Sequence, residues 1–142
     1  MPALREAAAW TAETFGKIDI LFANASIQAL RPLLKMEGAD WQDQIDVNLT
    51  STCNAIRAVA PYLVKNGGGR IIVTSSTQGR HGTKYGTAYT ASKWGIIGLM
   101  KSAALELGQI RNTESRSTRS SPVWSTPRSR AIGSDTRKRS MI

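Results

Sequence analysis

The amino-acid sequence predicts an α/β fold built on a parallel sheet. A short, mostly apolar run at residues 18–23 and a β-branched run at 70–75 are typical of strands, and three longer stretches with apolar side chains at helical spacing alternate with them. The order helix, strand, helix, strand, helix is the one that parallel α/β folds show. A chain of 142 residues, 41% of them hydrophobic, is long enough for one domain with a modest core.

The first helix is predicted over residues 2–16, where apolar side chains recur at turn spacing among charged ones: Leu4, Ala7, Ala8, Trp10 and Phe15. Gly16 is placed to end this helix, because glycine readily adopts the left-handed backbone found at helix C-termini. The run at 18–23 follows at once. Because this run is almost continuously apolar, we expect a strand that is covered on both faces.

A second, longer helix is predicted to follow Asp40, which is expected to cap it, and to continue to about Val64. Its apolar pattern is carried by Trp41, Ile45, Leu49 and Cys53. Pro61 is expected to kink the last turns. The three glycines at 67–69 run from helix into strand, the reverse of a phosphate-binding turn, so we interpret them as a plain turn before the second strand.

The third helix is predicted from Ala88 to about Leu107, with Gly108 behind it. Five apolar residues are the candidate packing residues of this helix: Trp94, Ile97, Met100, Leu105 and Leu107. The polar loop at 77–86 that precedes it contains His81, which we expect to be exposed to solvent.

Most of the formal net charge of +9 lies in residues 110–142, which hold eight basic and two acidic side chains together with eight serines. This composition buries too little apolar surface to offset chain entropy, so the sequence predicts a disordered tail after a folded segment at 1–109. A basic tail raises nucleic acid as a partner. Base stacking needs aromatic side chains among the basic ones, and the tail has only Trp124.

One cysteine, Cys53, and one histidine give neither an intramolecular disulfide nor a metal-ligand pattern. No apolar run approaches the roughly 20 residues that span a membrane, and the N-terminus lacks the pattern of a signal peptide. The sequence therefore predicts a soluble, cytoplasmic protein without a metal site or a membrane partner.

Tyr89 and Lys93 lie four residues apart, so both side chains project from one face of the third predicted helix. A fixed ammonium beside a phenol favours the phenolate, which suits acid–base chemistry, although such a pair also occurs by chance on many helices. Ser76 ends the second strand, where its hydroxyl can face that helix. Asn48 lies inside the second helix, and the small residues at 24–26 would let a ligand approach the backbone closely.

Together these residues resemble the short-chain dehydrogenase/reductase family. Tyr-Thr-Ala-Ser-Lys at 89–93 fits the family's Tyr-x-x-x-Lys motif, Val-Asn at 47–48 fits its Val-Asn pair, and Ser76 matches its serine. Ala-Asn-Ala-Ser at 23–26 stands where the family has Asn-Asn-Ala-Gly, so Ser26 takes the place of a glycine.

The resemblance covers residues 3–109 and implies a Rossmann-like, doubly wound parallel sheet. It also implies hydride transfer between NAD or NADP and an alcohol or carbonyl substrate, with Tyr89 as general acid/base and Ser76 as the hydrogen-bond donor to the substrate oxygen. Lys93 would favour the phenolate and bind the nicotinamide ribose, and Asn48 would position a water that links Lys93 to solvent.

Further roles follow from the same resemblance. Asn24, Ala25 and Ser26 would contact the cofactor, together with Tyr89 and Lys93. The segment at 27–31 and the loop at 78–84 would line the substrate pocket, with Gln78, His81 and Trp94 as candidates, although a packed Trp94 is the plainer interpretation. The second and third helices would pair with those of other subunits in a homo-oligomer.

The family's Gly-rich turn, Thr-Gly-x-x-x-Gly-x-Gly, is not in this sequence. We therefore expect a central fragment of such a domain that is inactive or barely folded by itself. Reading the back-translated residues 112–138 one base over permits a segment that resembles the family's next strand, which suggests a frame shift near codons 109–112. The alternatives are a nucleic-acid-binding protein that acts through 110–142 and a remnant reading frame without function; the flanking DNA sequence would decide among them.

Overall fold

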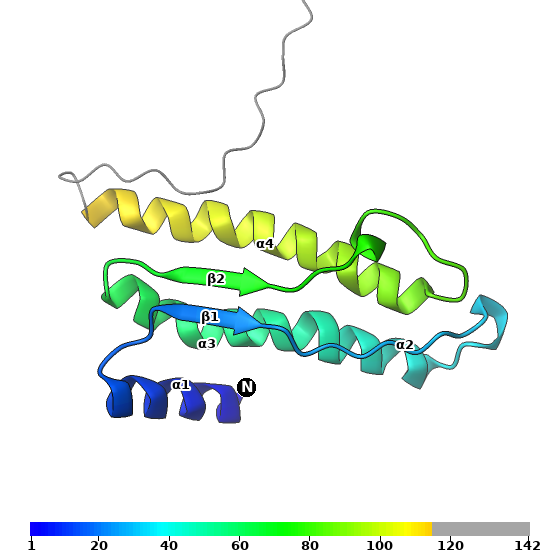
Figure 1. Cartoon of the computed structure of the whole chain (residues 1–142), viewed down its shortest axis with the longest axis horizontal. Coiled ribbons are helices and arrows are strands. Elements are labelled where there is room, and N and C mark those ends of the chain that lie inside the picture. The colour runs from blue at the N-terminus through cyan, green and yellow to red at the C-terminus, as the bar shows by residue number, and fades with distance from the viewer. Residues whose placement is uncertain (115–142) are drawn as a thin grey trace, which may run out of the picture.

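The computed structural model describes residues 1–114 and shows two parallel strands beside helices (Figure 1). Residues 115–142, which hold most of the predicted tail, lie outside the described residues. In chain order the elements are α1 (Pro2–Phe15), β1 (Ile20–Ala23), the 3-10 turn η1 (Leu33–Lys35), α2 (Gly38–Ile45), the π-helical η2 (Asp46–Thr50), α3 (Ser51–Lys65), β2 (Arg70–Val73), the 3-10 turn η3 (Thr77–Gly79) and α4 (Thr87–Glu114).

The predicted parallel sheet is confirmed. β1 and β2 pair in parallel, with Ile20 opposite Arg70 and Ala23 opposite Val73. Each strand is two residues shorter than the apolar run that predicted it. Gly16 ends α1 in the left-handed conformation, at φ 83°, as the sequence predicted.

The core lies between α1, α3 and one face of the sheet. Its buried members are Ala8, Ile18, Val59 and Leu63, and Leu21 and Ile71 pack against them from the strands. α3 passes behind β1 in Figure 1. The opposite face of the sheet exposes 57% of Ile20 and 61% of Phe22 in β1 and 47% of Ile72 in β2, so the prediction that the first strand is covered on both faces is wrong for residues 1–114. An apolar run shows that both faces can be buried, but only neighbouring elements can bury them.

α2, η2 and α3 follow one another without interruption and form one long helical stretch from Gly38 to Lys65. A capping box between Glu37 and Asp40 begins it, so Glu37 is the cap and the prediction of Asp40 is wrong by three residues. Pro61 lies inside α3, which continues beyond it. The departure from α-helical hydrogen bonding comes instead at η2, where the amide of Ser51 donates to the carbonyl of Asp46.

α4 begins one residue before the predicted start and continues through Gly108. Its buried residues are Ala88, Ser92, Lys93 and Ile96, whereas 54% of Trp94 and 69% of Leu105 are exposed. The packing predicted for Trp94 and Leu105 is therefore wrong in the described part of the chain. Small and polar side chains form the inward face, and Gly95 leaves room there for the side chain of Leu49 in η2: a Cβ on Gly95 would lie 2.7 Å from Cδ2 of Leu49.

Within residues 1–114, no helix combines the length and apolar character that crossing a membrane requires.

Candidate active site

Two of the predicted site residues, Asn24 and Lys93, are linked through Thr74 where the two strands end. Asn24, just after β1, accepts a 2.6 Å hydrogen bond at Oδ1 from Oγ1 of Thr74, just after β2. The carbonyl of Thr74 in turn accepts a 3.1 Å hydrogen bond from Nζ of Lys93. Thr74 was not among the predicted site residues, although its place between a strand and two serines is the signal that could have identified it.

Lys93 is 1% exposed, and its ammonium lies 5.3 Å from the ring centroid of Tyr89. An ammonium has three N–H donors, and a buried one is costly unless they are used. Among residues 1–114, Nζ of Lys93 donates to Thr74 alone. The remaining donors can therefore serve a ligand with hydroxyl or carbonyl oxygens.

Asn48 is fully buried in η2, and its side-chain amide uses all four of its hydrogen-bonding positions. Oδ1 accepts from the amide of Ile27 at 2.8 Å and from Oγ of Ser26 at 3.1 Å. Nδ2 donates to the carbonyl of Ile27 at 2.9 Å and to Oγ of Ser92 at 3.0 Å. Ser92 donates onward to the carbonyl of Tyr89 at 2.7 Å. Asn48 thus ties the segment after β1 to the turn of α4 that carries Tyr89 and Lys93.

Ser76 begins η3, where its hydroxyl accepts a 3.2 Å hydrogen bond from the amide of Gln78. Gln78 accepts at Oε1 from Oγ1 of Thr90 at 3.3 Å, so η3 is attached to α4 beside Tyr89. In the described part of the chain, no hydrogen bond joins the half-buried Tyr89 hydroxyl to another protein group. The structure therefore brings Ser76 and Tyr89 onto neighbouring elements without linking them directly.

Gly79 lets η3 lie directly on α4. A Cβ at this position would lie 2.7 Å from Oγ of Ser75, 2.9 Å from Cδ1 of Ile97 and 3.1 Å from the carbonyl of Lys93. We expect Gly79→Ala to lower the free energy of unfolding by about 1–3 kcal/mol, because the turn must move off the helix. Urea denaturation measures the loss. Gly82→Ala is the matched control, since a Cβ there meets nothing within 4 Å, and equal losses in the two variants would contradict the prediction.

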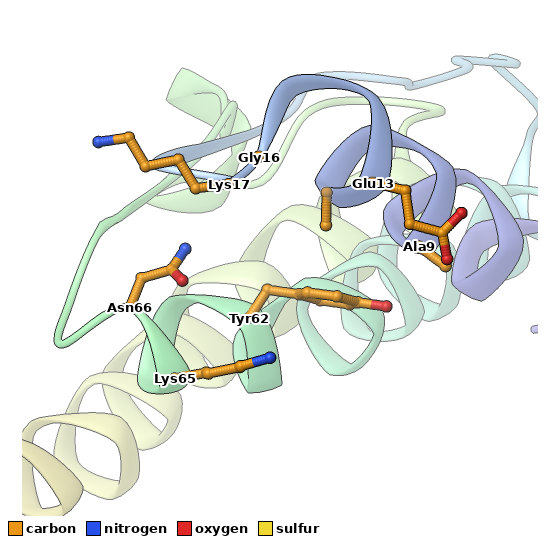
Figure 2. A pocket seen from close by; sticks show the side chains of 8 residues that line it. Ala9, Glu13, Gly16, Lys17, Tyr62, Lys65 and Asn66 are labelled. Carbon is orange, nitrogen blue, oxygen red and sulfur yellow. The ribbon is translucent and has the colours of Figure 1, made fainter.

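Other residues predicted to contact the cofactor or the substrate lie at the surface. Ala25 and Ser26 are exposed after β1, and His81 is exposed as the sequence predicted. A separate cavity of about 320 Å³ lies at the far end of α1 and α3 (Figure 2), where Tyr62 and Lys65 extend in the same direction from α3. None of the predicted site residues lines it. Within residues 1–114, no group of three or more potential ligands could hold a metal ion.

Together, the parallel sheet and the residues at its carboxyl edge fit the arrangement of the short-chain dehydrogenase family. The chain belongs to this family: the model described as short chain dehydrogenase matches residues 2–113. A putative short-chain type dehydrogenase/reductase of Mycolicibacterium smegmatis is 42% identical over 99 residues, which are 68% of this chain and 36% of that protein. The 3-oxoacyl-acyl-carrier-protein reductase of Thermotoga maritima is 38% identical over 104 residues, 73% of this chain and 42% of its own.

Solved structures agree with this assignment. Carveol dehydrogenase from Mycobacterium avium in complex with NAD has a TM-score of 0.74 and 40% identity, over 77% of this chain and 40% of that one. A metagenomic short-chain oxidoreductase in complex with NADP has a TM-score of 0.72 and 40% identity, over 77% of this chain and 50% of that one. The predicted family and α/β fold are confirmed. The chain spans about two fifths of the length of the curated relatives named above.

Proposed function

We propose that this chain supplies the catalytic segment, residues 1–109, of an oxidoreductase that transfers a hydride between NAD or NADP and a small alcohol or ketone. The observation that carries the proposal is the buried ammonium of Lys93 beside the ring of Tyr89. Its unused N–H donors fit the hydroxyls of a nicotinamide ribose. NAD or NADP, when bound, supplies or accepts the hydride.

The proton would be handled by this chain's own residues. In reduction the Tyr89 hydroxyl would give its proton to the substrate oxygen, and in oxidation the deprotonated Tyr89 oxygen would take the proton of the substrate hydroxyl. The ammonium of Lys93 donates to the carbonyl of Thr74 and lies beside the Tyr89 ring, where it would bind the nicotinamide ribose. The Ser76 hydroxyl, which caps η3 three residues after β2, would donate a hydrogen bond to the same substrate oxygen. The exposed backbone at Asn24–Ser26 would contact the cofactor.

Asn48 would act by holding the segment after β1 against α4. The resemblance implies that it positions a water, but its side-chain amide has no hydrogen-bonding position left for one. A water in the proton path would therefore have to be held by the backbone near η2. We assign the amide of Asn48 to keeping α4 in register with the segment after β1.

A chimera tests the proposed activity. Residues 2–113 would replace the matching segment of the Mycobacterium avium carveol dehydrogenase, whose own sequence supplies the remainder of the domain. We expect the chimera to oxidise carveol with NAD, followed by NADH absorbance. A chimera that binds NADH, seen by fluorescence, but gives no turnover with carveol or other small secondary alcohols would contradict the proposal.

We also propose that the protein acts in the cytoplasm as a homo-oligomer that uses the outer sides of the long helices. The exposed Trp41, Trp94 and Leu105 on these helices support such an interface, and the lone Cys53 suits a reducing compartment. Light scattering on the purified chain would measure the oligomeric state. No observation in residues 1–114 favours nucleic acid as the partner.

A further inference from the structure

Three polar side chains, spaced four residues apart along α2 and η2, hold the segment at 27–31. Oδ1 of Asn48 accepts from the amide of Ile27 at 2.8 Å. Oε1 of Gln44 accepts from the amide of Ala29 at 3.1 Å. Oδ2 of Asp40 accepts from Nε of Arg31 at 3.2 Å. Every second residue of the segment thus meets every fourth residue of the helix, in antiparallel order.

The two spacings match for a geometric reason. Four residues of helix rise about 6 Å, and two residues of extended chain span about 6.6 Å. A nearly extended segment can therefore place each of its alternate residues opposite successive turns of the helix. A slip of one residue would remove all three contacts at once, so the polar side chains fix the register of the segment.

Among the three polar side chains, Gln44 is second only to Asn48 in the number of hydrogen bonds that fix its amide group. It is 1% exposed, and its Nε2 donates to the carbonyl of Asp40 at 2.9 Å. That hydrogen bond fixes which end of the amide faces Ala29. The contact of Asp40 with Arg31 is weaker, because the two side chains are 23% and 49% exposed and an exposed ion pair contributes little. The hold on the middle of the segment therefore depends on Gln44.

The far end of the segment reaches the turn that precedes α4. The amide of Arg31 donates to the carbonyl of Tyr85 at 2.8 Å. Tyr85 has a φ of 66°, and it is the only non-glycine residue with a positive φ in the described part of the chain. A tyrosine in this conformation is strained, and the conformation persists only where the surroundings hold it. Because Tyr85 comes four residues before Tyr89, the segment connects Gln44 to the start of the catalytic helix.

We propose that Gln44 is a positioning residue that sets one wall of the substrate cleft. It holds the segment at 27–31 so that the amide of Arg31 fixes the strained turn at Tyr85, four residues before Tyr89. The inference about the cleft rests on the proposed function, whereas the contact itself does not. Gln44 would govern how well the substrate binds and leave the proton transfer at Tyr89 unchanged.

Amide hydrogen exchange of the full chain, resolved by NMR, tests the contact without any activity. We expect Gln44→Met, which keeps the side-chain length, to speed exchange about tenfold at Ala29 and Arg31, because Ala29 loses its acceptor and Arg31 loses its support. The amide of Ile27, held by Asn48, should change much less. Gln42→Met is the matched control, since Gln42 is exposed on the same helix, and it should leave all three amides unchanged.

Two results would overturn the proposed contact. One is unchanged exchange at Ala29 in Gln44→Met. The other is equal acceleration at Ala29, Ile27 and the core amides of Val59 and Leu63, because uniform acceleration reports general loss of stability.

The effect on the cleft is measured in the chimera. Gln44→Met should raise the KM for the alcohol roughly fivefold and leave kcat within about twofold, the pattern of lost binding. A fall in kcat at constant KM would overturn the assignment to the cleft. If the unsubstituted chimera has no activity, the proposed function fails, while the exchange experiment still decides whether Gln44 holds the segment.

Discussion

Replacing Tyr89 with phenylalanine is expected to lower turnover by about 100-fold or more, because a positioned acid–base group contributes roughly 10²–10⁴-fold to rate. The substitution removes the hydroxyl and keeps the ring beside the ammonium of Lys93. Within residues 1–114 that hydroxyl has no protein partner, so its loss strands no buried group. The measurement is kcat/KM of the chimera with carveol and NAD.

Tyr85→Phe is the matched control for this experiment. Tyr85 comes four residues before Tyr89, in the turn that precedes α4, and is 46% exposed; no lysine stands four residues after it. We expect its substitution to change kcat/KM by less than about twofold, since a surface hydroxyl contributes little to stability or to chemistry. Similar losses in the two variants would show that Tyr89 is not the acid–base group. Urea denaturation of both variants separates lost chemistry from lost folding.

Replacing Asn48 with alanine is expected to lower the free energy of unfolding by about 2–4 kcal/mol. Each buried polar group that loses its partner costs roughly 1–3 kcal/mol, and four hydrogen bonds end on this amide. The loss should also free the segment at Ile27 from α4, since Ser92 would no longer be joined to it. Urea denaturation at an unchanged m-value measures the effect.

Asn54→Ala supplies the control for Asn48. Asn54 lies in α3, is half-buried, and makes no side-chain hydrogen bond among the described residues, so its replacement should cost less than about 0.5 kcal/mol.

Ser26→Gly introduces the glycine that the family has at this position and removes one of the four hydrogen bonds of Asn48, for an expected loss of roughly 1 kcal/mol. If Asn48→Ala lowers the free energy of unfolding no more than Ser26→Gly does, the assignment of Asn48 as the residue that ties the segment after β1 to α4 is wrong.

The elements of this fold were predictable because each leaves a local pattern. Apolar residues at turn spacing identified α1 and α4, β-branched runs identified the strands, and Gly16 ended α1 as its backbone freedom allows. The π-helical η2 leaves no such pattern, since one altered turn barely changes the spacing of apolar side chains. Trp94 and Leu105 were misjudged because hydrophobicity states a preference for burial, while exposure depends on which elements lie nearby.

The candidate site divides in the same way. The Tyr-x-x-x-Lys spacing and the residues at the strand ends could be read along the chain, and they led to the family that the comparisons confirm. The hydrogen-bond partners of these residues could not be predicted from the sequence. Thr74 holds Lys93 from 19 residues away, and Ser92 meets Asn48 across 44 residues.

By itself, then, the sequence determined the parallel α/β order, the family and the residues proposed for proton transfer, because these depend on spacing over a few residues. Only the tertiary structure decided that the Asn48 amide uses all four of its hydrogen-bonding positions and that Gln44 accepts from the amide of Ala29. It also decided that Lys93 is buried while its ammonium donates to Thr74 alone among residues 1–114. A polar side chain on a helix looks the same in the sequence whether it faces water or a distant backbone amide. Which of the two applies is decided only in the folded chain, where the segment after β1 lies along α2 and η2.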